Sequence, residues 1–280
     1  MQRHFLSIND LSKKEILQIF NLAKRVKKNP TIYSSKLKNK TMAMIFEKPS
    51  LRTRVSFEVG MTELGGHAIY LGPNDIQMGV RETPMDIARN LERMVDIVMA
   101  RVFEHQKLID LSVDTKIPVI NALSDIEHPC QAMADFLTIL EHKKSFKKLK
   151  ITYIGDCNNN VTRSLYYLSQ KLDVNFVMAG PEGYKLGLGT ELMSPFEAIK
   201  NADCGITDTW VSMGLESEKK KRLKVFPKYQ INKKLMSLAK KDAIFMHCLP
   251  AYRGYEVTDE VIDGKQSVVF DEAENRLHVQ

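Results

Sequence analysis

The sequence predicts an α/β protein of two doubly wound parallel-sheet domains with the active site in the cleft between them. Three observations lead to this prediction. The chain has 280 residues, more than the about 100 to 200 that one domain usually holds. Short apolar runs alternate with helical patterns along most of its length. A polar stretch at residues 142–148 separates two series of these runs, so we place the domain boundary between residues 142 and 143.

The elements follow from the hydrophobic pattern. An amphipathic first helix is expected from the apolar residues Leu11, Ile16, Leu17, Phe20 and Leu22, which stand among lysines. Nine short apolar runs are expected to be strands, with helices between them: 42–46, 69–71, 97–100, 119–121, 151–154, 176–178, 204–207, 244–247 and 268–270. Ligands of such sheets bind outside the carboxyl ends of the strands, so the residues that follow strands are the candidates for function.

Composition excludes several classes of protein. With 44% hydrophobic and 27% charged residues, the chain resembles ordinary globular proteins. No apolar run approaches the about 18 residues of a membrane span, and the N-terminal region has no secretory-signal pattern, so we expect a cytoplasmic protein without a membrane partner. The 4 cysteines are widely spaced, which favours reduced thiols and predicts no metal site.

A formal net charge of +7 is compatible with any anionic partner. The densest basic run, in residues 219–224, is interpreted as a solvated loop. Because the sequence has no basic patch interleaved with aromatic residues, we expect no nucleic-acid partner.

The first motif is FEKPSLRTR, in which an expected strand end leads through a proline-containing turn into a helix that ends at Gly65. Ser50, Leu51, Arg52, Thr53 and Arg54 therefore stand at a helix N-terminus, where free backbone N–H groups and the helix dipole favour a phosphate, and the two arginines are expected to complete the cradle. Arginine suits this task because its guanidinium grips phosphate oxygens through two donors. The structural alternative is a helix cap with surface arginines.

The run from Ser50 to Arg54 resembles the carbamoyl-phosphate signature of the aspartate and ornithine carbamoyltransferases. The resemblance implies that carbamoyl phosphate binds here and that the carbamoyl group is transferred to an amine, without a metal or organic cofactor. Leu51 stands where the family commonly has threonine, which is compatible with the motif because this side chain need not contact phosphate.

The second motif, HPCQ, starts at His128 and directly precedes an expected helix. A histidine at a helix start is driven towards its neutral form by the helix dipole. The motif resembles the family's carbonyl-gripping residues, which implies that His128 and Arg101 polarise the carbamoyl carbonyl and that Gln131 helps to bind carbamoyl phosphate. Gln77 resembles a glutamine that reaches the phosphate of a neighbouring subunit. That likeness implies a homo-oligomer, either a trimer or a multiple of trimers.

Two further loops point to the amine acceptor. Asp208, Ser212 and Met213 lie in DTWVSMG after an expected strand, and a carboxylate with a hydroxyl can bind an α-ammonium group. Asn159 and Asn160 lie in IGDCNNN, where amides can meet an α-carboxylate, although a tight turn is the structural alternative. Glycines spaced as in a dinucleotide loop are absent there.

The motif HCLP contains Cys248 and Leu249. A free cysteine is most often a small buried apolar residue, and it can also be a nucleophile. Together with the SMG loop, HCLP resembles ornithine carbamoyltransferases specifically, which implies direct attack by the substrate amine and a catalytic role for Cys248 alongside Arg101 and His128. Cys248 and the backbone of Leu249 then hold the δ-amine and the carbamoyl nitrogen, and Arg276 helps to bind carbamoyl phosphate.

The resemblance covers almost the whole chain. It implies a carbamoyl-phosphate-binding domain at 1–142 and an ornithine-binding domain at 143–280, whose residues from about 271 return towards the first domain. The expected reaction gives L-citrulline and phosphate from carbamoyl phosphate and L-ornithine, in arginine biosynthesis. A shortened segment at 183–198 and the early end of the chain predict weaker stability or activity. A catabolic direction, another amine such as putrescine, and a silent binding protein are the alternatives.

Overall fold

A computed structural model describes residues 2–212 and 214–280. The chain forms two compact units, Met1–Ala134 with Asn275–Gln280 and Asp135–Glu274. Their boundaries fall inside two helices, α6 (Pro129–Lys143) and α12 (Val269–Val279). No helix of the described residues is long and apolar enough to cross a membrane.

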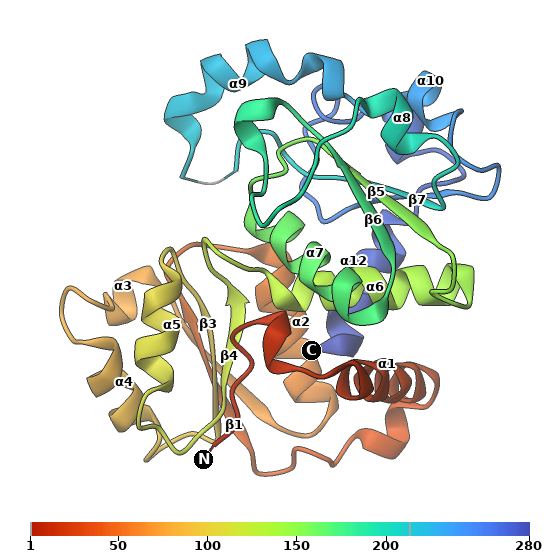
Figure 1. Cartoon of the computed structure of the whole chain (residues 1–280). Helices are drawn as coiled ribbons and strands as arrows, with labels where there is room; N and C mark the ends of the chain where they lie inside the picture. The colour runs from red at the N-terminus through yellow and green to blue at the C-terminus, as the bar shows by residue number, and fades with distance from the viewer. Residues whose placement is uncertain (1, 213) are drawn as a thin grey trace. The chain divides into compact units, whose positions relative to one another are not determined.

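The first unit contains a four-stranded parallel sheet in the order β2-β1-β3-β4 (Figure 1). The strands are β1 (Thr41–Phe46), β2 (His67–Leu71), β3 (Ile97–Arg101) and β4 (Val119–Leu123). Alternate residues of β1 enter different core clusters: Met42 and Met44 pack in one, and Ala43 and Ile45 in the other. Because successive side chains of a strand point to opposite faces, the sheet is covered on both sides, as continuous apolar runs predict.

The second unit repeats this arrangement in the order β6-β5-β7-β8, again with all strands parallel. Its strands are β5 (Lys150–Ile154), β6 (Asn175–Ala179), β7 (Cys204–Thr207) and β8 (Ile244–His247). The expectation of two parallel-sheet α/β domains is therefore confirmed, and eight of the expected strands are present with small changes at their ends.

The ninth expected strand, at residues 268–270, is wrong. A single parallel bridge, between Ser267 and Phe245, lies directly before the segment, and α12 begins at Val269. Val268 and Val269 are buried, whereas Phe270 is 73% exposed, so the three residues are not buried together as in a core strand. Asp271 and Glu272 lie in the first turn of α12, where acidic side chains interact favourably with the helix dipole.

Helices fill the connections. In the first unit they are α1 (Lys13–Lys28), α2 (Leu51–Glu63), α3 (Pro73–Ile76), α4 (Pro84–Leu91), α5 (His105–Ser112) and the 3₁₀ helices η1 (Ile8–Asp10) and η2 (Pro30–Tyr33). In the second they are α7 (Asn160–Leu172), α8 (Pro195–Ile199), α9 (Lys219–Val225), α10 (Lys233–Met236), α11 (Asp259–Ile262), η3 (Glu182–Tyr184), η4 (Glu216–Glu218) and η5 (Pro227–Tyr229). The first helix is confirmed: α1 buries Ile16, Phe20 and Ala23, whereas Leu22 lies off this face and is 44% exposed.

The strand order gives each sheet one topological switch point. In the first sheet the chain adds β2 on one side of β1 and then β3 on the other, and the second sheet does the same around β5. The switch points lie between β1 and β3 and between β5 and β7. Open α/β sheets bind ligands at the carboxyl ends of the strands beside such a point. The segments that follow these strands are those that the sequence singles out.

Candidate functional site

The first group of residues starts at the N-terminus of α2, directly after β1. Ser50 is the N-cap, and its hydroxyl accepts a hydrogen bond from the Thr53 N–H at 3.3 Å. Thr53 is buried, whereas the Leu51 side chain is 74% exposed. The first-turn N–H groups of a helix have no partner inside the helix, so this turn can receive an anion. Arg52 is partly buried in the same turn.

Arg276 of α12 links Thr53 to Gln131, another residue predicted to bind carbamoyl phosphate. Its Nη1 donates to Gln131 Oε1 at 2.5 Å, and its Nη2 donates to Thr53 Oγ1 at 3.1 Å. With the Gln280 amide oriented to satisfy its neighbours, its oxygen also accepts from Arg276 Nε and Nη2 at 2.9 Å. Three predicted carbamoyl-phosphate residues from distant segments, Thr53, Gln131 and Arg276, therefore form one buried cluster.

His128 is buried and carries no charge at neutral pH. Burial lowers its pKa well below the usual value, and the positive charges of Arg276, Arg101, Lys48 and Arg52 lower it further. A neutral imidazole can donate one hydrogen bond to a carbonyl oxygen. The expected protonation state is confirmed, although burial and four cations are the causes that the structure adds. These cations make the group positive, as a dianionic ligand requires.

Lys48 is a member of this group that the sequence analysis missed. Its side chain is 9% exposed, and its Nζ lies 4.8 Å from the centroid of the Phe103 ring. Burial, helped by the charge of Arg101, lowers the pKa of Lys48 to about 8. Its position directly after β1, in FEKPS, is the sequence signal that could have found it.

Gln77 lies outside this group. It follows α3 in a left-handed conformation with φ of 51°. It lines a separate cavity of about 270 Å³ together with Glu47 and Lys107, which form an ion pair at 2.6 Å. The structure therefore does not bring Gln77 together with His128 or Arg276.

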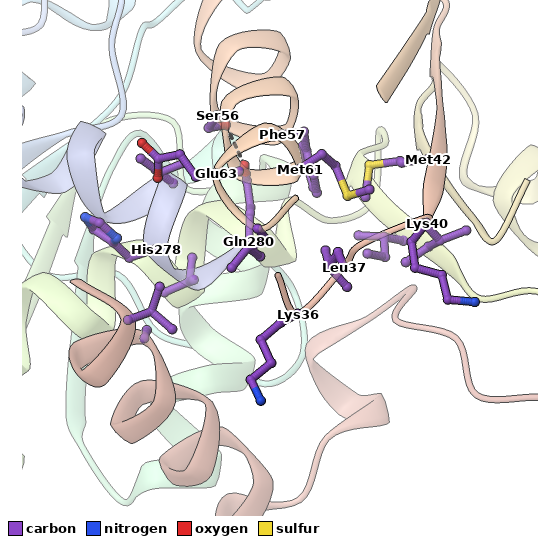
Figure 2. Close-up of a pocket in the computed structure, with 18 of the residues that line it drawn as sticks. Lys36, Leu37, Lys40, Met42, Ser56, Phe57, Met61, Glu63, His278 and Gln280 are labelled. Atoms are coloured by element: carbon purple, nitrogen blue, oxygen red, sulfur yellow. Dashed lines mark hydrogen bonds between the residues drawn. The ribbon is translucent and has the colours of Figure 1, made fainter. Parts of the chain in front are cut away.

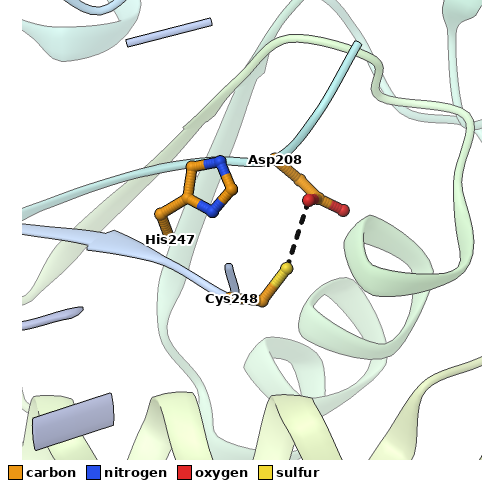
Figure 3. A group of neighbouring side chains, drawn as sticks. All are labelled: Asp208, His247 and Cys248. Atoms are coloured by element: carbon orange, nitrogen blue, oxygen red, sulfur yellow. Dashed lines mark hydrogen bonds between the residues drawn. The ribbon is translucent and has the colours of Figure 1, made fainter. Parts of the chain in front are cut away.

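The second group of residues lies at the switch point of the other sheet. The Cys248 thiol donates to Asp208 Oδ1 at 3.1 Å (Figure 3). The same oxygen accepts from the Thr209 N–H at 2.7 Å. Burial and the neighbouring Asp208 charge raise the pKa of Cys248 well above its usual value. Nucleophilic cysteines need the thiolate, so the neutral thiol here argues against a covalent role.

All four cysteines are free thiols. Cys130, Cys157 and Cys204 are buried, and burial raises the pKa of each of them. Cys248 alone is partly exposed.

Asp208, His247 and Cys248 offer ligand atoms within 4.8 Å of one another (Figure 3). Both imidazole nitrogens are already engaged, because Nδ1 accepts from the Leu249 N–H at 2.9 Å and Nε2 lies 3.2 Å from Glu256 Oε1. A metal ligand needs a free nitrogen lone pair. This cluster is therefore organised by hydrogen bonds and offers a metal ion only two ready ligands.

Asn159 is used locally. It caps α7 through Oδ1, which accepts from the Thr162 N–H at 2.8 Å, and its Nδ2 donates to the Tyr153 hydroxyl and the Asp156 carbonyl, each at 3.0 Å. Asn160 is the first residue of α7 and is partly exposed. A substrate carboxylate would have to replace one of the local hydrogen bonds of Asn159.

The loop after β7 carries the remaining predicted residues. Ser212 is partly exposed, and its carbonyl accepts from the Leu215 N–H at 3.0 Å. Met213, also predicted to bind the acceptor, lies outside the described residues.

The interpretation of the basic run at 219–224 as a solvated loop is wrong. The run forms α9, and Arg222 within it is 5% exposed. Its Nη1 donates to Asp156 Oδ2 at 2.5 Å and to the Trp210 carbonyl at 2.9 Å. Arg222 thus ties the loop after β5 to the loop after β7, where the predicted acceptor residues lie. Its lysine neighbours are exposed, as expected.

A mostly apolar cavity of about 490 Å³ lies elsewhere in the first unit, lined by α1, α2 and the last residues of the chain (Figure 2). At its wall the Gln280 amide nitrogen donates a hydrogen bond to the Ser56 hydroxyl oxygen. None of the predicted substrate residues lines this cavity, so we do not assign it to the reaction.

Two family models match successive parts of the chain. Residues 3–141 match the carbamoyl-P binding domain of the aspartate/ornithine carbamoyltransferases, and residues 147–280 match their Asp/Orn binding domain. The ornithine carbamoyltransferase of Methanosarcina mazei is 50% identical over an alignment of 297 positions, covering 100% of this chain and 97% of the relative.

Solved structures of ornithine carbamoyltransferases are also similar to the chain. The ornithine carbamoyltransferase of Pyrococcus furiosus superposes with a TM-score of 0.94 at 48% identity, covering 99% of this chain and 94% of the other. The anabolic ornithine carbamoyltransferase of Campylobacter jejuni superposes with a TM-score of 0.92 at 44% identity, covering 100% and 96%.

Proposed function

The chain belongs to the aspartate/ornithine carbamoyltransferase family and is a carbamoyltransferase, and from this membership we propose that its acceptor is L-ornithine. The products are then L-citrulline and phosphate. The observation that carries the proposal is the 3.1 Å hydrogen bond between Cys248 and Asp208, because it joins the HCLP and DTWVSMG loops in one group. The relatives that the chain matches at 49% and 50% identity are themselves named ornithine carbamoyltransferases.

Carbamoyl phosphate is held by the first group of residues. Its phosphate binds at the start of α2, to Ser50, Arg52, Thr53 and the backbone of Leu51, with Gln131 and Arg276 beside it. Arg101 and the neutral His128 donate to the carbamoyl oxygen. Both are buried, so water does not weaken the stabilisation of the negative charge that grows on this oxygen as the amine attacks.

Ornithine is held by the second group of residues. Asp208 and Ser212, together with Met213, bind the α-ammonium end, and Asn159 and Asn160 bind the α-carboxylate. The Cys248 thiol and the Leu249 backbone orient the δ-amine and the carbamoyl nitrogen. The amine attacks as the free base, and the phosphate that leaves can accept the proton released. The raised pKa of Cys248 supports this direct attack, because a neutral thiol is a poor nucleophile.

We further propose a homotrimer, or a multiple of trimers, in which Gln77 serves the phosphate of a neighbouring subunit. Leu51, Val55 and Val59 support self-association, because they follow at helical spacing along α2 and are 74%, 48% and 37% exposed. We place the reaction in the cytoplasm and in the biosynthetic direction, towards arginine. The free thiols fit a reducing compartment.

The acceptor is tested by measuring citrulline or the corresponding ureido product with ornithine, putrescine and N-acetylornithine in parallel. We expect kcat/KM to be highest for ornithine by at least about two orders of magnitude, because unpaired buried polar groups penalise an analogue that lacks the α-amino acid. A higher value with putrescine would reassign the acceptor.

The phosphate cradle is tested separately with Arg52→Ala and calorimetry of carbamoyl phosphate binding. We expect the affinity to fall at least about tenfold, since a charge-assisted hydrogen bond is worth about 1.5 to 3 kcal/mol. Arg54→Ala is the matched control, because Arg54, although it stands in the same motif, is exposed and is engaged by Glu58 and the Tyr70 ring. Equal affinities for the wild-type chain and Arg52→Ala would show that the cradle is misassigned.

A further inference from the structure

His247 is a buried histidine that ends β8, one residue before Cys248. Its side chain and that of Glu256 are both 0% exposed. The backbone N–H of Leu249 donates to His247 Nδ1 at 2.9 Å. Because a backbone N–H can only donate, Nδ1 carries the lone pair, and the proton of the neutral ring is on Nε2.

The other ring nitrogen completes a bridge across the HCLP turn. Nε2 donates to Glu256 Oε1 at 3.2 Å, and the same oxygen accepts from the Tyr252 N–H at 2.6 Å. The two side chains therefore hold N–H groups on both sides of Pro250. The backbone of His247 is anchored independently, since its N–H donates to Glu272 Oε2 at 2.9 Å.

Leu249 has a backbone conformation that needs this support. Its φ of 55° lies in the left-handed region, which residues with a Cβ seldom adopt. Such conformations persist only where the surroundings fix them, and they cluster at functional sites. The N–H of this left-handed residue donates to the His247 imidazole.

We propose that His247 is a positioning residue of the acceptor half-site: its Nδ1 sets the left-handed turn at Leu249 and so orients the Cys248 thiol and the Leu249 backbone towards the reacting nitrogen atoms. Glu256 holds the ring in the required orientation. The inference rests on the proposed function, which gives Cys248 and Leu249 their roles. His247 acts through these neighbours and does not itself contact substrate.

The test separates the two ring nitrogens with His247→Asn and His247→Gln. The asparagine oxygen lies about where Nδ1 lies and can still accept from the Leu249 N–H, whereas the longer glutamine reaches Glu256 and leaves that N–H without its acceptor. We expect His247→Asn to keep kcat within about fivefold of wild type, and His247→Gln to lose at least about tenfold more, the effect of one buried hydrogen bond. The KM for carbamoyl phosphate should change less than about threefold in both variants.

Equal kcat values for the two variants would overturn the proposal. A decrease in kcat that merely parallels the decrease in melting temperature would overturn it as well. If His247→Gln does not fold, Glu256→Gln and Glu256→Leu replace the pair. In Glu256→Gln an oxygen still accepts from the Tyr252 N–H and from the ring, so kcat should stay within about fivefold of wild type. Glu256→Leu lacks this oxygen, so its kcat should fall at least about tenfold. Equal rates for these two would likewise overturn the proposal.

A readout that does not need turnover separates this inference from the proposed function. Nitrogen NMR of the histidine-labelled wild-type chain at pH 8 should show His247 with its proton on Nε2 and an Nδ1 that accepts a hydrogen bond. A proton on Nδ1 would refute the positioning role even if citrulline is formed. Absence of citrulline with the expected tautomer would instead refute the acceptor assignment.

Discussion

At the scale of single residues, the ion pair between Arg222 and Asp156 is the contact whose loss should be most visible in stability. Both side chains are buried, and their atoms are 2.5 Å apart. Removing one partner of a buried pair leaves an uncompensated charge, which costs about 3 to 5 kcal/mol. We expect Arg222→Met to lower the free energy of unfolding in urea by about 3 kcal/mol or more.

The neighbouring Lys221 provides the control for this measurement. It lies in the same helix and is exposed, so Lys221→Met should change the free energy by less than about 0.5 kcal/mol. Equal losses in the two variants would show that Arg222 stabilises α9 only as part of a charged helix and not through Asp156.

His128 should make the stability of the chain depend on pH. Its pKa in the folded protein lies well below the value of about 6.5 in the unfolded chain. As the pH falls, the unfolded state therefore binds the proton first. The free energy of unfolding is unaffected by protonation of this histidine above about pH 6.5 and decreases as the pH falls from there towards the folded pKa. We expect urea unfolding between pH 7 and 5 to show a smaller pH dependence in His128→Gln than in wild type, and parallel curves would contradict this.

The sequence predicted several individual residues of the site and could not predict others. Thr53, Gln131 and Arg276 were expected to act together, and the structure joins them by hydrogen bonds. The sequence predicts a surface charge at Arg222, because the buried partner Asp156 lies 66 positions away. The pattern of neighbours along the chain carries no information about such a contact.

At the scale of secondary structure, the exposed apolar face of α2 predicts association. Val55 is 48% exposed at the centre of this face, and a glutamate there would have to be desolvated in any interface that covers it. We expect Val55→Glu to shift the chain from oligomer towards monomer in sedimentation velocity experiments. Ile32→Glu is the control, because Ile32 is an exposed apolar residue outside α2, and a wild-type chain that is already monomeric would exclude the proposed assembly.

Eight of nine expected strands are present because buried parallel strands appear as continuous apolar runs bounded by polar residues. The run at 268–270 has the same appearance, yet its Phe270 is 73% exposed at the start of α12. A run of three apolar residues is too short for periodicity to distinguish a strand from a helix start. The strand was wrongly predicted at 268–270 because the apolar run is short, and not because of its composition.

At the scale of the whole molecule, the two groups of residues predict opposite effects of pH on the reaction. The δ-ammonium of ornithine should resemble lysine, with a pKa of about 10.4, so kcat/KM for ornithine should rise with pH. In the first unit the pKa of Lys48 is about 8. Above that pH its charge is lost, and carbamoyl phosphate should bind less tightly.

We therefore expect kcat/KM for ornithine to rise between pH 6 and 8 and the KM for carbamoyl phosphate to increase above about pH 8. Steady-state kinetics with each substrate varied at each pH provides the measurement. The increase in KM should be absent in Lys48→Met. A wild-type KM for carbamoyl phosphate that stays constant to pH 9.5 would contradict the contribution of Lys48.

Agreement between the sequence and the structure is closest for the architecture of each domain. Alternating apolar and helical patterns predicted two parallel sheets, and each unit has one. The compact units divide inside α6 and α12, where the hydrophobic pattern runs on without a break. Composition alone therefore could not locate this division.

The distribution of the four thiols gives the chain a practical chemical property. Burial raises the pKa of all four thiols, so each is protonated at neutral pH and reacts slowly. Cys130, Cys157 and Cys204 are buried, whereas Cys248 is partly exposed, so a small alkylating electrophile should reach Cys248 first. The rate of its modification would report directly on whether the acceptor loops are occupied, without any engineered label.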